Sequence, residues 1–171
     1  LPQLTRLRIH SRMPVVIPER ITPALTAMLG ASRLRVSLVI HANHAQELDA
    51  SVARALEPLR RAGITLLNQS VLLAGVNDEV SALVELCERL FAIGVLPYYV
   101  HLLDRVAGSA HFEVSEERAR HLQRELLAHL PGYLVPRFVR ELPDAAAKVP
   151  LEGIPESVFV KAQTSTAGIR A

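Results

Sequence analysis

Five short apolar runs with strand character lie along the chain, and each of them ends in a group of polar residues. In a parallel α/β barrel the carboxyl ends of the strands all open on one face, where the active site is built. Polar side chains at successive strand ends would therefore converge on one cavity although they are far apart in sequence, which is the layout of an enzyme. The predicted strands are residues 7–9, 37–40, 64–67, 98–100 and 134–139, and the polar groups follow at 10–12, 41–44, 68–70, 101–104 and 140–141.

Segments with helical periodicity separate the predicted strands and carry start and stop signals. Thr22, Asp78 and Ser115 are expected N-caps of three helices, and residues 46–62 form a fourth. Pro58 lies inside the fourth, where it removes one backbone hydrogen bond and is expected to kink the helix. Strands that alternate with helices and are apolar on both faces indicate a parallel sheet. Because five strands cannot close an eight-stranded barrel, the predicted fold class is α/β, as a partial parallel (β/α) barrel or an open sheet.

Composition removes several classes of function. The chain has 171 residues, a net charge of +2 and only seven Phe and Tyr side chains, so nucleic-acid binding is poorly supported. No apolar stretch approaches the roughly 20 residues of a membrane span. The single cysteine, Cys87, excludes an internal disulfide and suits a reducing cytoplasm. Residue 1 is Leu and a strand is predicted from residue 7, so we expect that the N-terminal part of a longer protein is absent.

Three residues at or after strand ends are candidates for chemistry. Lys148 follows a loop of small residues, and a poorly solvated lysine can form a Schiff base with an aldehyde such as pyridoxal phosphate. Taken alone, an isolated loop lysine is usually solvated. Asp104 and Glu141 follow two different strands; they are either solvated loop acids or a pair that binds a substrate ammonium by charge-assisted hydrogen bonds.

Each of the other polar candidates has a structural interpretation as well as a functional one. His41 and His44 are either metal ligands or imidazoles that hydrogen-bond the loop backbone, and no convincing third ligand lies near them in sequence. Arg8 and Arg12 are either binding residues for a phosphate or carboxylate group, or members of ion pairs on the surface. Asn68 begins a glycosylation sequon, but at the end of a buried strand this match is accidental.

A set of longer segments is too specific to be generic: residues 8–12 (RIHSR), 14–22 (PVVIPERIT), 41–44 (HANH), 63–73 (GITLLNQSVLL), 75–78 (GVND) and 97–99 (PYY). Together they resemble the lysine 2,3-aminomutase family of radical S-adenosylmethionine enzymes. The resemblance implies that residues 1–150 are the C-terminal portion of a radical-SAM TIM-like barrel and that residues 151–171 are a C-terminal tail. Residues 101–112 resemble one branch, the bacterial enzymes that form (R)-β-lysine for modification of elongation factor P.

The resemblance also implies an activity and its cofactors. The family isomerises α-lysine to β-lysine with S-adenosylmethionine, a 4Fe-4S cluster and pyridoxal 5′-phosphate. Lys148 matches the lysine that holds pyridoxal phosphate, and Asp104 matches an acid that binds the distal ammonium of the substrate. Glu141 stands where the catabolic enzymes have an Asp, which leaves the reach of this acid open. His41 and Gln69 fall where family members line the region of the cluster and S-adenosylmethionine.

Two departures from the family pattern limit this expectation. The cluster motif CxxxCxxC is absent, so these residues alone are expected to be inactive, with the motif expected upstream of Leu1. The glycine run of the catabolic enzymes is replaced by Asp144 and three alanines.

The expected partner is a small-molecule substrate, lysine, in a cytoplasmic enzyme that could be a homo-oligomer, with neither nucleic acid nor membrane as a partner. The alternatives are an aminomutase for another amino acid such as glutamate, a truncated relative without catalysis, and a metal-dependent barrel hydrolase that uses His41 and His44.

Overall fold

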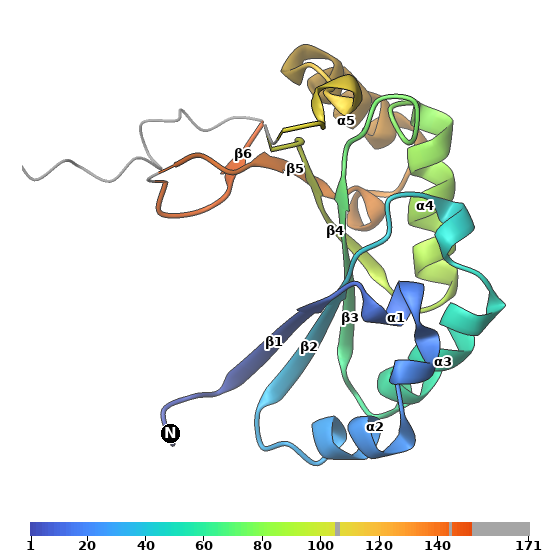
Figure 1. Ribbon diagram of the computed structural model, residues 1–171, viewed down its shortest axis with the longest axis vertical. Coiled ribbons are helices and arrows are strands. Elements are labelled where there is room, and N and C mark those ends of the chain that lie inside the picture. Colours follow the sequence, from blue (N-terminus) through green and yellow to red (C-terminus); the bar gives the residue numbers. More distant parts are fainter. Residues whose placement is uncertain (105–106, 144, 152–171) are drawn as a thin grey trace, which may run out of the picture.

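A computed structural model describes residues 1–104, 107–143 and 145–151. They form one six-stranded sheet whose strands follow each other in sequence order (Figure 1). The strands are β1 (Arg6–Ser11), β2 (Arg35–Ile40), β3 (Thr65–Val71), β4 (Leu96–His101), β5 (Arg137–Arg140) and β6 (Val149–Pro150). The α-helices are α1 (Met13–Val16), α2 (Pro23–Gly30), α3 (Ala50–Arg61), α4 (Val80–Ala92) and α5 (Glu116–His129), and the 3-10 helices are η1 (Pro18–Arg20), η2 (Ala45–Glu47), η3 (Ala110–Phe112) and η4 (Gly132–Leu134).

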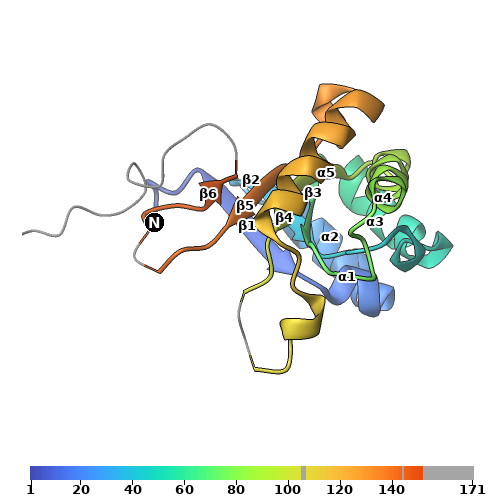
Figure 2. The same ribbon diagram turned by 90° about the horizontal axis from the view of Figure 1, so that it is seen from above.

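The first five strands pair in parallel, and β6 pairs antiparallel with β5. The α-helices lie on one side of the sheet in two perpendicular views, so the described residues place no helical layer on the opposite face (Figures 1 and 2). A doubly wound sheet would carry helices on both faces, whereas consecutive βα units of a barrel place them all outside. The predicted class, an α/β fold with a partial parallel (β/α) barrel, is confirmed.

Several element boundaries differ from the prediction. Strands β1, β3 and β4 continue through residues 10–11, 68–71 and 101, most of which were expected to follow the strands. The last parallel strand begins at Arg137 and not at residue 134, because Pro136 has no N–H for the ladder and residues 132–134 form η4. Asp78 does not cap α4: its carboxylate accepts from the Gly75 N–H, and the cap position falls to Glu79. Strand β6 was not predicted.

The segment predicted as one helix over residues 46–62 is divided into η2 and α3. Asp49 causes the division, because its carboxylate accepts hydrogen bonds from the N–H groups of Ser51 and Val52 and so caps α3. Pro58 lies inside α3, and Gly63 follows the helix with a φ of 77°, the left-handed conformation expected of a C-terminal glycine.

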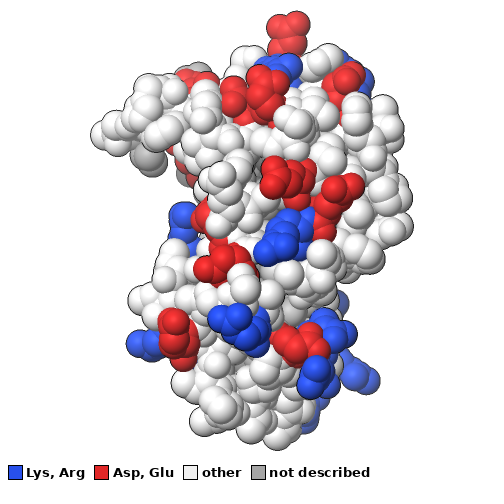
Figure 3. Space-filling model, turned by 90° about the vertical axis from the view of Figure 1, so that its right-hand side faces the viewer, with Lys and Arg blue, Asp and Glu red and all other residues white. Residues whose placement is uncertain are grey.

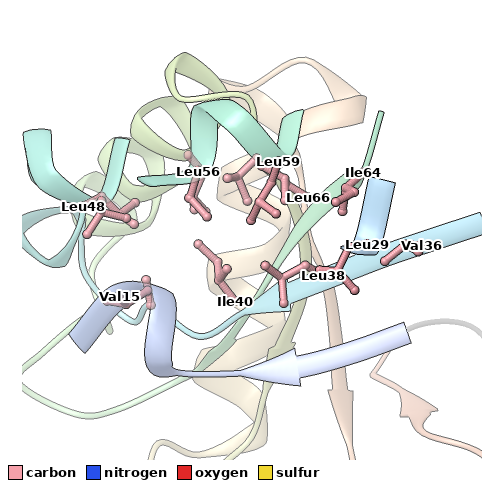
Figure 4. Packing of buried hydrophobic residues seen from close by; sticks show 14 of the residues in the cluster. Val15, Leu29, Val36, Leu38, Ile40, Leu48, Leu56, Leu59, Ile64 and Leu66 are labelled. Atoms are coloured by element: carbon pink, nitrogen blue, oxygen red, sulfur yellow. The ribbon is translucent and has the colours of Figure 1, made fainter. Parts of the chain in front are cut away.

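The core between helices and sheet is made of two clusters of buried side chains. In the first, Leu38 and Ile40 of β2 point toward Leu56 and Leu59 of α3, and Leu66 of β3 joins them (Figure 4). Burying a leucine of this kind stabilises the fold by about 1.5–3 kcal/mol. The second cluster lies under α4 and α5 and includes Leu83, Cys87, Leu122, Leu126, Phe138 and Leu151.

The helix-covered side carries acidic and basic side chains in alternation (Figure 3). Several of them form ion pairs, such as Glu57 with Arg60 and Arg61 on α3 and Arg120 with Glu116 on α5. None of the helices in the described part of the chain combines the length and the apolar character that crossing a bilayer requires. Of the predicted tail, only Leu151 is described, and residues 152–171 lie outside the described residues.

Candidate active site

Alternation along the strands decides which side chains reach the face of the sheet that lacks helices. In β3, Leu66, Asn68 and Ser70 are buried toward the helices, whereas the residues between them are partly exposed. Gln69 therefore points to the open face. Cross-strand register places Tyr99 of β4 directly opposite Gln69, and His101 opposite Val71. The carboxyl-terminal halves of β3 and β4 thus supply polar side chains to one surface.

Lys148 is directed at this surface by the short antiparallel strand β6. Val149 pairs with Arg140, which brings Lys148 beside Glu141 at the end of β5. The Lys148 Nζ donates a hydrogen bond to the Glu141 carboxylate and lies 3.1 Å from Nε2 of His101. It also lies 5.6 Å from the centre of the Tyr99 ring. With 27% of its side chain exposed, Lys148 is held among neighbours and is not a freely solvated lysine.

His101 is the most deeply buried ionisable group of this cluster, with 8% of its side chain exposed. Burial, together with the positive charge of Lys148, lowers the pKa of His101 to about 4, although the nearby carboxylates of Glu141 and Asp104 oppose the shift. The hydrogen bond from Lys148 lowers the pKa of Glu141. At neutral pH the cluster therefore contains a neutral imidazole between an ammonium and a carboxylate.

His41 and Gln69 each present a buried polar atom that has no hydrogen-bond partner within the described residues: Nε2 of His41 and Oε1 of Gln69. The His41 ring lies edge-on to His10, with 5.8 Å between ring centres. Burial, Arg12 and Lys148 lower the pKa of His41. An unpaired buried polar atom is costly unless a ligand or water completes it. These two predicted cofactor residues thus have free capacity for a bound group.

The loop that carries His41 is fixed by buried amides. Asn68 bonds both the N–H and the carbonyl of Ala42, at 2.9 and 3.0 Å. Asn77, which is fully buried, donates to the carbonyls of Asn43 and Val71 at 2.8 and 2.9 Å. The sequon asparagine is therefore a structural residue. The network attaches the end of β2 to the end of β3, so His41 is held on a rigid support.

Asp104 and Glu141 line one pocket of about 940 Å³ at the carboxyl ends of β4 and β5. Glu141 thus contacts Lys148 and also belongs to the pocket wall. The beginning of α5 closes the opposite wall, where Glu116 pairs with Arg140 at 2.7 Å. Among the described residues that line the pocket, acidic groups outnumber basic ones: Asp104, Glu113, Glu116 and Glu141 against Arg140.

Two of the other sequence candidates have structural partners. His44 accepts the Gln46 N–H at Nδ1 and so caps η2, which confirms the structural interpretation for this residue. Arg12 pairs with Glu47 at 3.2 Å. Among residues 1–104, 107–143 and 145–151, no three His, Cys, Asp or Glu side chains are grouped so that they could hold a metal ion.

Tyr99 and His101 were assigned no role from the sequence. Both belong to a strand end that the hydrophobic pattern located, but their relation to Lys148 depends on a contact between residues 47 positions apart. The only available signal was that His101 ends an apolar run, as His41 does.

Several curated proteins are similar to this chain over most of its length. The L-lysine 2,3-aminomutase of Escherichia coli (strain K12) is 52% identical over 152 residues, which are 89% of this chain and 44% of that protein. The Haemophilus influenzae protein of the same name is 48% identical over 142 residues, and the Clostridium subterminale protein is 41% identical over 151 residues. The chain is homologous to part of the L-lysine 2,3-aminomutases.

The predicted resemblance is thereby confirmed, and the chain spans less than half the length of these relatives, 44%, 42% and 36%. No protein-family model matches it. A solved radical SAM methyltransferase from Sphaerobacter thermophilus overlaps with a TM-score of 0.49 at 20% identity, covering 72% of this chain and 40% of that one. That likeness is too low to inform either fold or function.

Proposed function

We propose that the chain is the pyridoxal phosphate- and substrate-binding part of an L-lysine 2,3-aminomutase, an isomerase that converts α-lysine to β-lysine. The observation that carries the proposal is the 52% identity to the Escherichia coli protein of that name over 89% of the chain. The geometry agrees with it, because Lys148 is partly buried and lies beside a pocket that contains Asp104 and Glu141.

The described residues include side chains suited to hold pyridoxal phosphate and a second, polar ligand. When bound, pyridoxal phosphate supplies the group that carries the migrating nitrogen. Lys148 would hold it, since its amine is directed to the open face of the sheet, and the unpaired atoms of His41 and Gln69 would bind polar groups of S-adenosylmethionine. Cys87 is buried in the core, where burial raises the pKa of its thiol to about 12, so the described residues do not fit a 4Fe-4S cluster.

Substrate orientation is the task of the acidic pocket. Its excess of carboxylates attracts the distal ammonium of lysine, which Asp104 and Glu141 would bind by charge-assisted hydrogen bonds. The same carboxylates would repel the distal carboxylate of glutamate, so the pocket favours lysine. Within the cluster, Glu141 and His101 hold the Lys148 amine in place until it is used.

Finer features of this proposal rest on the resemblance alone. Residues 101–112 support (R)-β-lysine for elongation factor P as the purpose of the reaction. The single cysteine supports a cytoplasmic location. A homo-oligomer is compatible with this proposal.

Product analysis tests the proposal. Protein made from its complete coding sequence is supplied with iron, sulfide, pyridoxal phosphate, S-adenosylmethionine and a strong reductant such as dithionite, and incubated without oxygen with lysine or glutamate. We expect β-lysine and no β-glutamate. Exclusive turnover of glutamate would contradict the substrate, and failure to convert any amino acid in a protein that binds its cofactors would support a relative without catalysis.

A further inference from the structure

The contacts among His101, Lys148 and Glu141 determine which ring nitrogen of His101 carries a hydrogen. An ammonium group has only hydrogens to offer, so the 3.1 Å contact with Lys148 requires that Nε2 of His101 accepts. The proton of the neutral ring must then be on Nδ1, which lies 3.7 Å from the Glu141 carboxylate. The Nδ1 hydrogen thus lies near the negative charge of Glu141, at a distance longer than a hydrogen bond, and the contact with Lys148 determines the tautomer.

We propose that His101 is a positioning residue for Lys148: its neutral ring accepts a hydrogen bond from the lysine amine and holds that amine at the open face of the sheet. The proposal rests on the proposed function, because it names the group that prepares Lys148 for an aldehyde-bearing cofactor. His101 itself takes no part in bond making.

Burial of His101 favours a neutral ring. Lys148 before β6 and His41 after β2 also disfavour a positive charge on the imidazole, whereas Glu141 after β5 and Asp104 after β4 favour it, and the net effect is a lowered pKa. A protonated His101 would place a second positive charge beside Lys148. Its Nε2 would then carry a hydrogen and could no longer accept a hydrogen bond from the lysine amine.

The rate at which pyridoxal phosphate attaches to Lys148 tests the proposal. The complete protein is mixed with pyridoxal phosphate, reduced with borohydride at set times and digested, and labelled Lys148 is counted by mass spectrometry relative to Lys161, the other lysine of the sequence. The variants are His101→Gln, which keeps an acceptor, His101→Met, which removes it, and His129→Gln, whose site is exposed on α5.

We expect labelling of Lys148 to slow about tenfold or more in His101→Met, since misplacing a reacting group by an ångström costs up to 10²-fold. His101→Gln should stay within about threefold of the unaltered protein, as expected for a retained hydrogen bond. Equal rates for His101→Met and the unaltered protein would overturn the proposal while leaving the proposed function intact. No labelling of Lys148 in the unaltered protein would instead contradict the proposed function.

Nitrogen NMR of protein labelled in its histidines tests the positioning role without cofactor, and its first readout, the position of the ring proton, needs no variant. At pH 7 we expect His101 to be neutral with its proton on Nδ1, and Nε2 to shift when Lys148→Met removes the donor. A proton on Nε2, or a charged ring at this pH, would overturn the proposal even if pyridoxal phosphate attaches normally.

Discussion

At the scale of single residues, burial of the His101 imidazole links the candidate site to pH. Its pKa is lowered from 6.5 to about 4. Between pH 4 and pH 6.5, His101 is therefore protonated in the unfolded chain and neutral in the folded chain. The contribution of His101 to stability is therefore fully present above pH 6.5 and is lost as the pH falls toward 4.

We predict that stability falls more steeply below pH 6.5 in the unaltered protein than in His101→Gln, by up to about 1.4 kcal/mol per pH unit. His10 and His41 also have lowered pKa values, but their effect is common to both proteins. Urea unfolding at several pH values between 4 and 7 measures the two slopes. Parallel slopes would show that His101 is protonated as readily in the folded state as in the unfolded one.

The acidic pocket gives a second prediction at this scale. Asp104→Asn keeps the size of the side chain and removes its charge, so the KM for lysine should rise about tenfold or more, the value of one charge-assisted hydrogen bond. Glu88→Gln removes an acid on α4, which lines other grooves, and should leave KM unchanged. The outcome against the account is an equal effect of both variants in steady-state assays.

The candidate residues were predictable because strand ends could be located from the hydrophobic pattern. His41, Gln69, Asp104, Glu141 and Lys148 all follow or end apolar runs, and the structure places them at the carboxyl ends of the strands or beside β6. Their roles remain predictions. The acceptor function of His101 was not accessible, because it depends on the position of Lys148 just before β6, a two-residue strand that carries no periodic signal.

At the scale of elements, the strands and helices follow from periodicity and their exact ends from single hydrogen bonds. The hydrophobic pattern located β1 to β4, and Thr22 and Ser115 cap α2 and α5 as predicted. Asp78 does not cap α4, because its carboxylate accepts a hydrogen bond from the Gly75 N–H in the preceding turn. Competition of this kind between local partners cannot be decided from spacing alone.

The amide network between β2 and β3 makes a prediction about this scale. Asn77→Ala would leave two partly buried carbonyls and the Leu73 N–H without their partner, at a cost of about 3 kcal/mol. Asp78→Ala removes one exposed bond in the same loop and should cost less than about 1 kcal/mol. Denaturant unfolding compares the two. Equal losses would mean that water replaces Asn77 and that the His41 loop is not rigidly supported.

At the scale of the whole molecule, the described helices cover the sheet on one side only, and β1 is its first strand. Among the described strands, β1 pairs with β2 alone, so its outer edge presents unpaired backbone groups. An open edge of this kind is a template for pairing with other chains.

We therefore predict that residues 1–171 made alone associate with themselves, whereas protein made from the complete coding sequence has a fixed stoichiometry. Sedimentation velocity over a range of concentrations distinguishes the two behaviours. A stable monomer of the isolated chain at all concentrations would show that the edge and the open face are protected within these residues.

The central claim is that the amine of Lys148 receives pyridoxal phosphate. Its most direct measurement is borohydride reduction of the complete protein after loading with pyridoxal phosphate, followed by peptide mapping. The account predicts one phosphopyridoxyl group per chain, on Lys148, and its loss in Lys148→Arg. A group attached elsewhere, or undiminished labelling in Lys148→Arg, would contradict the account.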